Sequence, residues 1–244
     1  LAALQVPAER IDEVAALVNR FAEVNHNYLR DHPINLWFVV TAQDEARLDQ
    51  TLADIERQAG CGSVLRCPLV EEYRIDLGFD LTREHAPRPV RTFVRQPLAL
   101  NAQDQQLVGA LQAGLPLVRH PYEAIAAWLG IGEHVVLDRL AQWVDAGVIR
   151  RLGFIVRHHE LGYRANAMVV WQVPVEQAGR FGHCLRQASD VTLCYQREAS
   201  PPRWPYNLYC MIHGRDRTPI QHRIEALTRA SGLSGFKRDV LFST

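Results

Sequence analysis

An internal repeat limits the folds open to this chain more than any other feature of its sequence. The segment PINLWFVV, which starts at Pro33, reappears as PYNLYCMI from Pro205, an offset of 172 residues. Upstream the offset is 167, which pairs Tyr28 with Tyr195 and leaves a longer loop, residues 198–204, in the second copy. A chain that contains two copies of one unit is expected to fold as two similar domains.

Each copy shows the pattern strand, helix, strand, strand, helix, strand. In the second copy these elements are expected at 163–173, 176–188, 190–197, 206–213, 217–231 and 235–242. This order is typical of ferredoxin-like domains. We therefore expect an α+β fold with one such βαββαβ domain at 1–81 and another at 159–244. Leu1 aligns with Met168, in the middle of a strand, so the first domain is expected to lack its N-terminal part.

A different module is expected between the copies. After a linker rich in proline and arginine at 82–100, the pattern predicts three short helices at 104–111, 121–129 and 133–146, followed by a β wing at 147–156. Together they predict a winged helix-turn-helix domain at 101–158. A second module of this kind is expected before Leu1, because the chain looks like a truncated tandem.

Composition excludes several classes of protein. The apolar fraction of 48% excludes a disordered chain, and the longest apolar runs, such as 34–42, are too short to cross a membrane. Five cysteines without a CxxC pair argue against a disulfide framework and against structural zinc, and no secretory signal opens the chain, so a cytoplasmic protein is expected. Of the 27 lysine and arginine residues, all except Lys237 are arginine. This bias reflects either a GC-rich genome or an anionic ligand.

The strands of both copies have a polar and aromatic face. It holds Asn35, Trp37, Val39 and Thr41 in the first copy and Asn207, Tyr209, Met211 and His213 in the second. On the neighbouring strands, His26, Tyr28 and Arg30 share a face, as do Leu193, Tyr195 and Arg197. The opposite, apolar face is expected to pack on helices. The polar and aromatic face then contacts either a partner sheet or a flat, carboxylated ligand.

The copies differ in their histidines. His26 is replaced by Leu193, His32 by Trp204, and Thr41 by His213. Such differences fit one site that uses both halves or two sites with unequal roles, although a histidine on a strand can also be structural. The expected recognition helix at 133–146 carries three acidic residues and one arginine, which is the wrong charge for phosphate contact, so no DNA binding is expected.

Several strings in the chain resemble one known family. They are GVIRRLG from Gly147, GYRANAMVVW from Gly162, CYQR from Cys194, WPYNLYCMIHG from Trp204, HNYLR from His26 and NLWF from Asn35. A helix-turn-helix followed by a ferredoxin-like effector domain resembles the Lrp/AsnC regulators, and these strings resemble one branch of them, the siroheme decarboxylases, in the fused NirDL form of haem d1 biosynthesis. The resemblance covers nearly the whole chain.

This resemblance implies a carboxy-lyase that removes carbon dioxide from two acetate side chains of siroheme to give 12,18-didecarboxysiroheme. It implies no cofactor beyond the iron tetrapyrrole of the substrate. Lrp/AsnC effector domains pair sheet to sheet, so an intramolecular pseudo-dimer is expected, with further homo-oligomers open. Two alternatives remain: an Lrp/AsnC-type transcription regulator and a protein that binds the tetrapyrrole without reacting with it.

The flat substrate with eight carboxylates indicates roles for individual residues. Protonation of the product carbon is expected from His26, His213, Tyr28 or Tyr195. Substrate contacts are expected from Arg30, Arg197, Arg150, Arg151, Asn35, Trp37, Asn207, Tyr209, His32 and Trp204. His26 or His213 is a candidate ligand of the siroheme iron.

Overall fold

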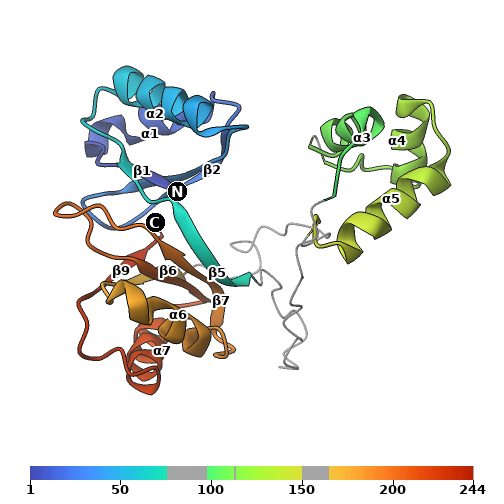
Figure 1. Ribbon diagram of the computed structural model, residues 1–244. Coiled ribbons are helices and arrows are strands. Elements are labelled where there is room, and N and C mark those ends of the chain that lie inside the picture. Colours follow the sequence, from blue (N-terminus) through green and yellow to red (C-terminus); the bar gives the residue numbers. More distant parts are fainter. Residues whose placement is uncertain (76–97, 113, 150–164, 244) are drawn as a thin grey trace. The chain divides into compact units, whose positions relative to one another are not determined.

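A computed structural model describes residues 1–75, 98–112, 114–149 and 165–243 (Figure 1). The first copy contains β1 (Ala2–Leu4), the 3-10 turn η1 (Ala8–Arg10), α1 (Ile11–Val18), β2 (Val24–Leu29), β3 (Leu36–Val40), α2 (Glu45–Ala59), β4 (Leu65–Arg66) and β5 (Leu69–Ile75). The middle segment contains α3 (Ala102–Gln112), α4 (Pro121–Leu129) and α5 (Glu133–Asp145). The second copy contains β6 (Ala165–Trp171), α6 (Val175–Leu185), β7 (Val191–Arg197), β8 (Leu208–Gly214), α7 (Arg217–Ala230) and β9 (Arg238–Phe242).

Local sequence signals explain where the helices begin and end. Asp44 caps α2, because its side chain accepts a hydrogen bond of 2.7 Å from the backbone N–H of Arg47. Gly60 ends the same helix in the left-handed conformation, with φ at +59°. In the second copy, Asp216 occupies the position that precedes α7. The repeat therefore preserves the start of this helix in both copies.

The described residues form two antiparallel sheets, with strand orders β2-β3-β1-β4 and β5-β7-β8-β6-β9. Figure 1 shows α1 and α2 over the first sheet, and α6 and α7 over the second. Each sheet buries an apolar face against its own pair of helices, with Phe38 in the first core and Cys210 and Ile212 in the second. The α+β class and the ferredoxin-like order of elements are therefore confirmed.

The two sheets also share a core on their opposite faces. This inter-sheet core contains Ala3, Ile34, Trp37, Leu65 and Cys67 from the first copy and Met168, Val170, Trp204, Tyr206, Tyr209 and Leu241 from the second. The two copies consequently form one compact unit, whereas α3, α4 and α5 form another.

Strand β5 comes from the first copy but forms the edge strand of the second sheet, and hereafter we call this the exchange of β5. It is the last strand of the first copy in sequence, yet it pairs with β7, from Leu69 opposite Arg197 to Ile75 opposite Leu193 (Figure 1). Tyr73 of β5 is buried in the core of the second copy, where its hydroxyl donates to Gln196 Oε1 at 2.9 Å. The exchange therefore joins the two copies through both backbone pairing and side-chain packing.

The middle segment has its own small core. Leu107 of α3, Ile125 of α4, and Val136, Leu140 and Trp143 of α5 pack together. The predicted helices are present here, whereas residues 150–156 of the wing expected at 147–156 lie outside the described residues. Along the described parts of the chain, no helix has both the length and the apolar character needed to cross a membrane.

Candidate active site

His26 and Tyr28 of β2 and Arg30 directly after it share one face of the first sheet, where His26 and Tyr28 are exposed and Arg30 is buried. His26 is opposite Val39, and Tyr28 is opposite Trp37. The rings of His26 and Tyr28 meet edge to face with centroids 5.0 Å apart, and the guanidinium carbon of Arg30 lies 5.4 Å from the centre of the Tyr28 ring. The three side chains thus form a continuous row. Burial lowers the pKa of His26 and raises that of Tyr28.

Arg30 ends this row as a buried cation and is only 4% exposed. Its Nη1 lies 3.3 Å from the backbone oxygen of Asn166 and 3.4 Å from Asn166 Oδ1, and its Nε has no hydrogen-bond partner among the described residues. Burial lowers the pKa of the guanidinium to about 10, so Arg30 stays charged at neutral pH. A buried charge is costly unless an opposite charge faces it, so this position is suited to a carboxylate ligand.

Asn166 connects Arg30 to the second copy. In the sheet it lies opposite His213, which shares the inter-sheet face of β8 with Tyr209 and Met211. His213 Nδ1 is 2.9 Å from the hydroxyl oxygen of Thr192 on β7. The row from His26 to Arg30 therefore continues across the two copies through Asn166 to His213 and Thr192. Hereafter we call these six residues the cross-copy row.

The second copy repeats the tyrosine and arginine of this row. The guanidinium carbon of Arg197 lies 5.1 Å from the ring centre of Tyr195 and 5.8 Å from that of Tyr209. Its Nη1 donates to the backbone oxygen of Cys67 at 3.2 Å, and burial lowers its pKa. In both copies, the arginine of Tyr-x-Arg therefore lies over the ring of its own tyrosine and contacts a backbone oxygen of the other copy.

Three aromatic residues predicted to contact the substrate lie in the inter-sheet core. Trp37, Trp204 and Tyr209 are each at most 2% exposed. The ring centroids of Trp37 and Trp204 are 4.9 Å apart, and Trp204 Nε1 donates to the Tyr209 hydroxyl at 2.7 Å. Between the two open expectations for this face, the structure places a partner sheet against these three side chains. Their role in substrate binding stays a prediction.

Asn35 and Asn207 have equivalent structural contacts. Asn35 accepts from the backbone N–H of Val6 at 2.9 Å and donates to the Val6 oxygen at 2.8 Å. Asn207 makes the same pair of bonds with Val173, at 3.0 and 2.9 Å. Each amide therefore holds the start of a central strand to the end of the neighbouring strand, and a direct substrate contact stays a prediction.

His32 joins the two copies near the same region. Its Nε2 lies 3.4 Å from Asp239 Oδ2, its Nδ1 accepts from the backbone N–H of Ile34 at 3.0 Å, and its ring meets Trp204 edge to face. Two shallow surface hollows border it, and one of them also includes Arg30. Arg150 and Arg151 lie outside the described residues, and within the described ones no group of three or more His, Cys, Asp or Glu side chains is arranged to hold a metal ion.

The equivalence of the two copies is the sequence signal that could have pointed to Thr192. The two polar residues Asn25 and Thr192 are equivalent in the copies, and each lies one residue before the equivalent positions 26 and 193. Asn25 Nδ2 donates to Thr41 Oγ1 at 3.2 Å, and Thr41 is the equivalent of His213. Asn166 has no such signal, because its partner before Leu1 is not in the sequence.

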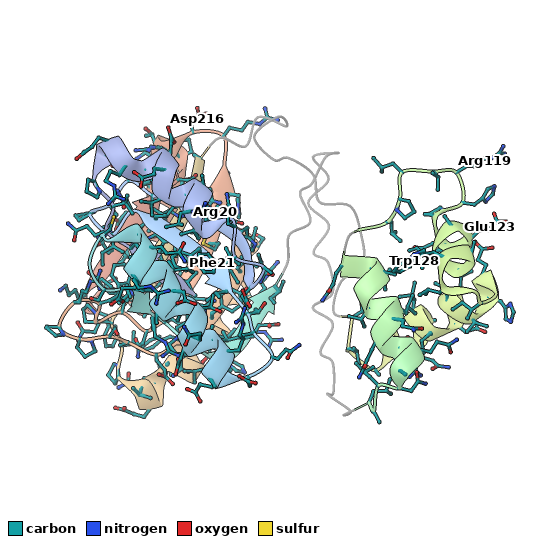
Figure 2. All side chains as sticks on the ribbon, turned by 90° about the horizontal axis from the view of Figure 1, so that it is seen from above. Arg20, Phe21, Arg119, Glu123, Trp128 and Asp216 are labelled. Carbon is teal, nitrogen blue, oxygen red and sulfur yellow. The ribbon has the colours of Figure 1, made fainter. Side chains whose placement is uncertain are left out.

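The helix-turn-helix unit offers few cations on its described helices. The single arginine of α5, Arg139, forms a two-pronged ion pair with Asp104 of α3, which is 3% exposed. Figure 2 labels three further residues of this unit, with Arg119 before α4 and Glu123 and Trp128 on it. Trp128 is 72% exposed. The single arginine of α5 is therefore already paired within the unit.

Comparison with known families matches both parts of the chain. Residues 1–74 and 160–244 match the AsnC-like ligand binding domain. Residues 104–150 match the siroheme decarboxylase NirDL-like HTH domain.

Full-length relatives agree with these matches. The siroheme decarboxylase NirDL subunit of Paracoccus denitrificans (strain Pd 1222) is 41% identical over 246 residues, covering 100% of this chain and 74% of that protein. The siroheme decarboxylase of Hydrogenobacter thermophilus is 31% identical over 245 residues, covering 100% of this chain and 72% of that protein. Two crystal structures of the siroheme decarboxylase NirDL, one in co-complex with an iron-uroporphyrin III analogue, superpose with TM-scores of 0.70 and 0.68 at 29% and 28% identity, each covering 100% of this chain and 70% of the other. The chain belongs to the siroheme decarboxylase NirDL family, whose members are carboxy-lyases.

Proposed function

We propose that this protein removes carbon dioxide from two acetate side chains of siroheme and yields 12,18-didecarboxysiroheme for haem d1 biosynthesis. The observation that carries the proposal is the buried Arg30, which has no carboxylate partner among the described residues and lies in a row with Tyr28 and a histidine. The NirDL relatives, one of them crystallised with an iron-uroporphyrin III analogue, support an iron tetrapyrrole as the ligand of this family.

The reaction needs positioning more than it needs reactive groups. Arg30 and Arg197 hold carboxylates that are not lost, by charge-assisted hydrogen bonds in addition to their contacts with the tyrosine rings. The reacting acetate lies in a less polar place, where its carboxylate loses solvation. The bond between the carboxylate carbon and the methylene carbon breaks, carbon dioxide leaves, and the electron pair passes into the macrocycle.

Protonation of the methylene carbon then completes a methyl group. His26 and His213 are the two histidines of the cross-copy row, and Tyr28 and Tyr195 are the neighbouring hydroxyl donors. One of the histidines is also suited to ligate the siroheme iron. No electrons enter or leave overall, so no cofactor beyond the substrate's own iron tetrapyrrole is required.

A transcriptional role is disfavoured by the charges of the helix-turn-helix. Arg139 forms an ion pair with Asp104, and the exposed side of α5 carries the acidic residues Glu133 and Asp138. Phosphate contact needs available cations, so duplex DNA is not a partner in this proposal.

The decisive experiment is anaerobic incubation of the purified protein with siroheme, followed by mass analysis of the extracted tetrapyrrole. Loss of two carbon dioxide units is the expected result. Siroheme that binds and returns unchanged would make the protein a tetrapyrrole carrier or sensor. Absence of any binding would overturn the proposal and favour the regulator, which is then tested by the salt dependence of DNA binding.

A further inference from the structure

Two buried polar side-chain atoms lie on paired residues where the first copy meets the second. Arg30 and Ser243, the residue directly after β9, form an isolated antiparallel bridge. Residues paired in this way point to the same side, with Cβ atoms about 4.5–5.5 Å apart. Arg30 Nε and Ser243 Oγ are both buried, and neither has a hydrogen-bond partner among the described residues. Buried polar atoms in proteins are nearly always paired, so these two are suited to bind a polar group of a ligand.

Backbone hydrogen bonds from both copies fix this pair of residues. The backbone oxygen of Asn166 accepts from the backbone N–H of Ser243 at 2.8 Å and from Arg30 Nη1 at 3.3 Å. One residue further along, the backbone N–H of Asp31 donates to the Phe242 oxygen at 2.8 Å. The arginine and the serine are therefore held side by side by the fold itself.

Charge indicates which polar group fits. The acidic residues nearest in sequence to the pair have other partners. Asp31 Oδ2 lies 2.9 Å from Arg217 Nη1, and Asp239 Oδ2 lies 3.4 Å from His32 Nε2. The Nε–H of Arg30 and the serine hydroxyl can each donate one hydrogen bond. A carboxylate accepts both bonds and neutralises the buried cation, whereas a water molecule supplies no charge.

The second copy has a different residue at the equivalent place. Its arginine, Arg197, lies opposite Leu69, and the backbone N–H of Glu198 donates to the Pro68 oxygen at 3.0 Å, as in the first copy. Leu69 is thus the structural counterpart of Ser243, but its side chain has no donor and is 49% exposed. The repeat therefore provides an arginine in both copies and a hydroxyl beside it only in the first.

We infer that Arg30 and Ser243 together bind one carboxylate of the tetrapyrrole, and that this carboxylate is retained in the product. The inference rests on the proposed decarboxylation and adds Ser243 to its site. Two charge-assisted hydrogen bonds stabilise the carboxylate in its charged form. Decarboxylation requires the opposite, a carboxylate that loses its stabilisation, so the group bound here is not the one that reacts.

Equilibrium binding tests the inference without turnover. The probe is iron-uroporphyrin III, whose binding is followed by its visible absorbance. Ser243→Ala is expected to weaken binding about 10- to 100-fold, which is the usual contribution of one hydrogen bond to a charged group. Leu69→Ala, at the equivalent place of the second copy, is the matched control and leaves the affinity unchanged. Equal affinity of Ser243→Ala and the unmodified protein would overturn the inference.

A double-mutant cycle tests whether both residues bind the same carboxylate. Arg30→Met combined with Ser243→Ala is expected to weaken binding less than the two single losses multiplied together, because the two contacts depend on each other. Losses that multiply fully would assign the side chains to different groups and would overturn the inference. Urea denaturation checks folding, and Ser243→Ala is expected to keep the stability of the protein without ligand, because Ser243 Oγ has no hydrogen bond among the described residues.

Kinetics with siroheme distinguish this inference from the proposed function. Ser243→Ala is expected to raise KM and to leave kcat unchanged, because a retained carboxylate is bound equally before and during the reaction. A lower kcat at unchanged KM would assign Ser243 to the reacting acetate and contradict the inference. If siroheme binding depends on Ser243 but the unmodified protein releases no carbon dioxide, the proposed function fails while the carboxylate site stands.

Discussion

At the scale of single residues, the repeat preserves the cations and changes the histidines. Tyr28 and Arg30 recur as Tyr195 and Arg197 with the same contact between ring and guanidinium. The histidines do not recur at the same positions. Groups that hold a nearly symmetric polyanion are thus expected in both copies, whereas groups that transfer protons differ between them.

Replacing Arg30 with methionine is expected to change siroheme affinity and the free energy of unfolding in different ways. We expect siroheme affinity to fall about 10- to 100-fold, because the hydrogen bonds to one carboxylate are lost. The free energy of unfolding is expected to stay the same or rise, because a buried cation without a carboxylate partner among the described residues is removed. Titration calorimetry and urea denaturation measure the two effects. Arg57→Met, on the exposed side of α2, is the control and leaves both unchanged; equal affinity in the two variants would remove Arg30 from the site.

His26 is expected to titrate below its ordinary pKa of 6.5, because partial burial disfavours the charged ring. A pKa that is lowered by folding adds stability above pH 6.5, and this stability is lost as the pH falls through the folded value. NMR titration of the protein without ligand checks the midpoint. Tyr28→Ala exposes the ring and raises the midpoint toward 6.5, whereas Tyr195→Ala leaves it in place. A midpoint above 6.5 in the unmodified protein contradicts the assignment.

At the scale of elements, the pattern of apolar and polar residues predicts well where each helix and strand lies in the sequence. It predicts poorly which sheet a strand joins. The helix expected at 217–231 lies at Arg217–Ala230, and the strand expected at 190–197 lies at Val191–Arg197. The exchange of β5 is absent from the sequence expectations, because alternation of side chains specifies the faces of a strand and not the sheet it joins. For the same reason, the sequence does not decide whether the strand face that carries Trp37 contacts a ligand or a partner sheet.

The contact of β5 with α6 gives a sharp test of the exchange. A Cβ at Gly182 would lie 2.2–2.5 Å from ring atoms of Tyr73, whereas a Cβ at Gly179 would be 3.9 Å from its hydroxyl. Gly182→Ala is therefore expected to lower the free energy of unfolding by about 1–3 kcal/mol through overpacking. Gly179→Ala is the matched control and is expected to raise it by up to about 1 kcal/mol through helix propensity. Urea denaturation measures both, and equal stability of the two variants would show that Tyr73 does not pack against α6.

At the scale of the molecule, the two copies are expected to unfold together. Their shared inter-sheet core and the exchanged β5 join them into one compact unit, while α3, α4 and α5 form a unit with a separate core. A site whose row of residues crosses both copies needs this arrangement, because local opening of either copy would separate Arg30 from Asn166.

Hydrogen exchange measured by mass spectrometry tests this cooperativity. Gly182→Ala changes only the second copy, yet it is expected to lower the protection of β1 and β3 in the first copy as much as that of β7 and β8, because opening one sheet exposes the core of the other. The protection of α3, α4 and α5 stays unchanged. The reciprocal variant Val136→Ala, in the core of α5, is expected to lower protection only in those three helices. Loss of protection confined to β6–β9 in Gly182→Ala would mean that the copies open independently, and the cross-copy row would then form only while both copies are closed.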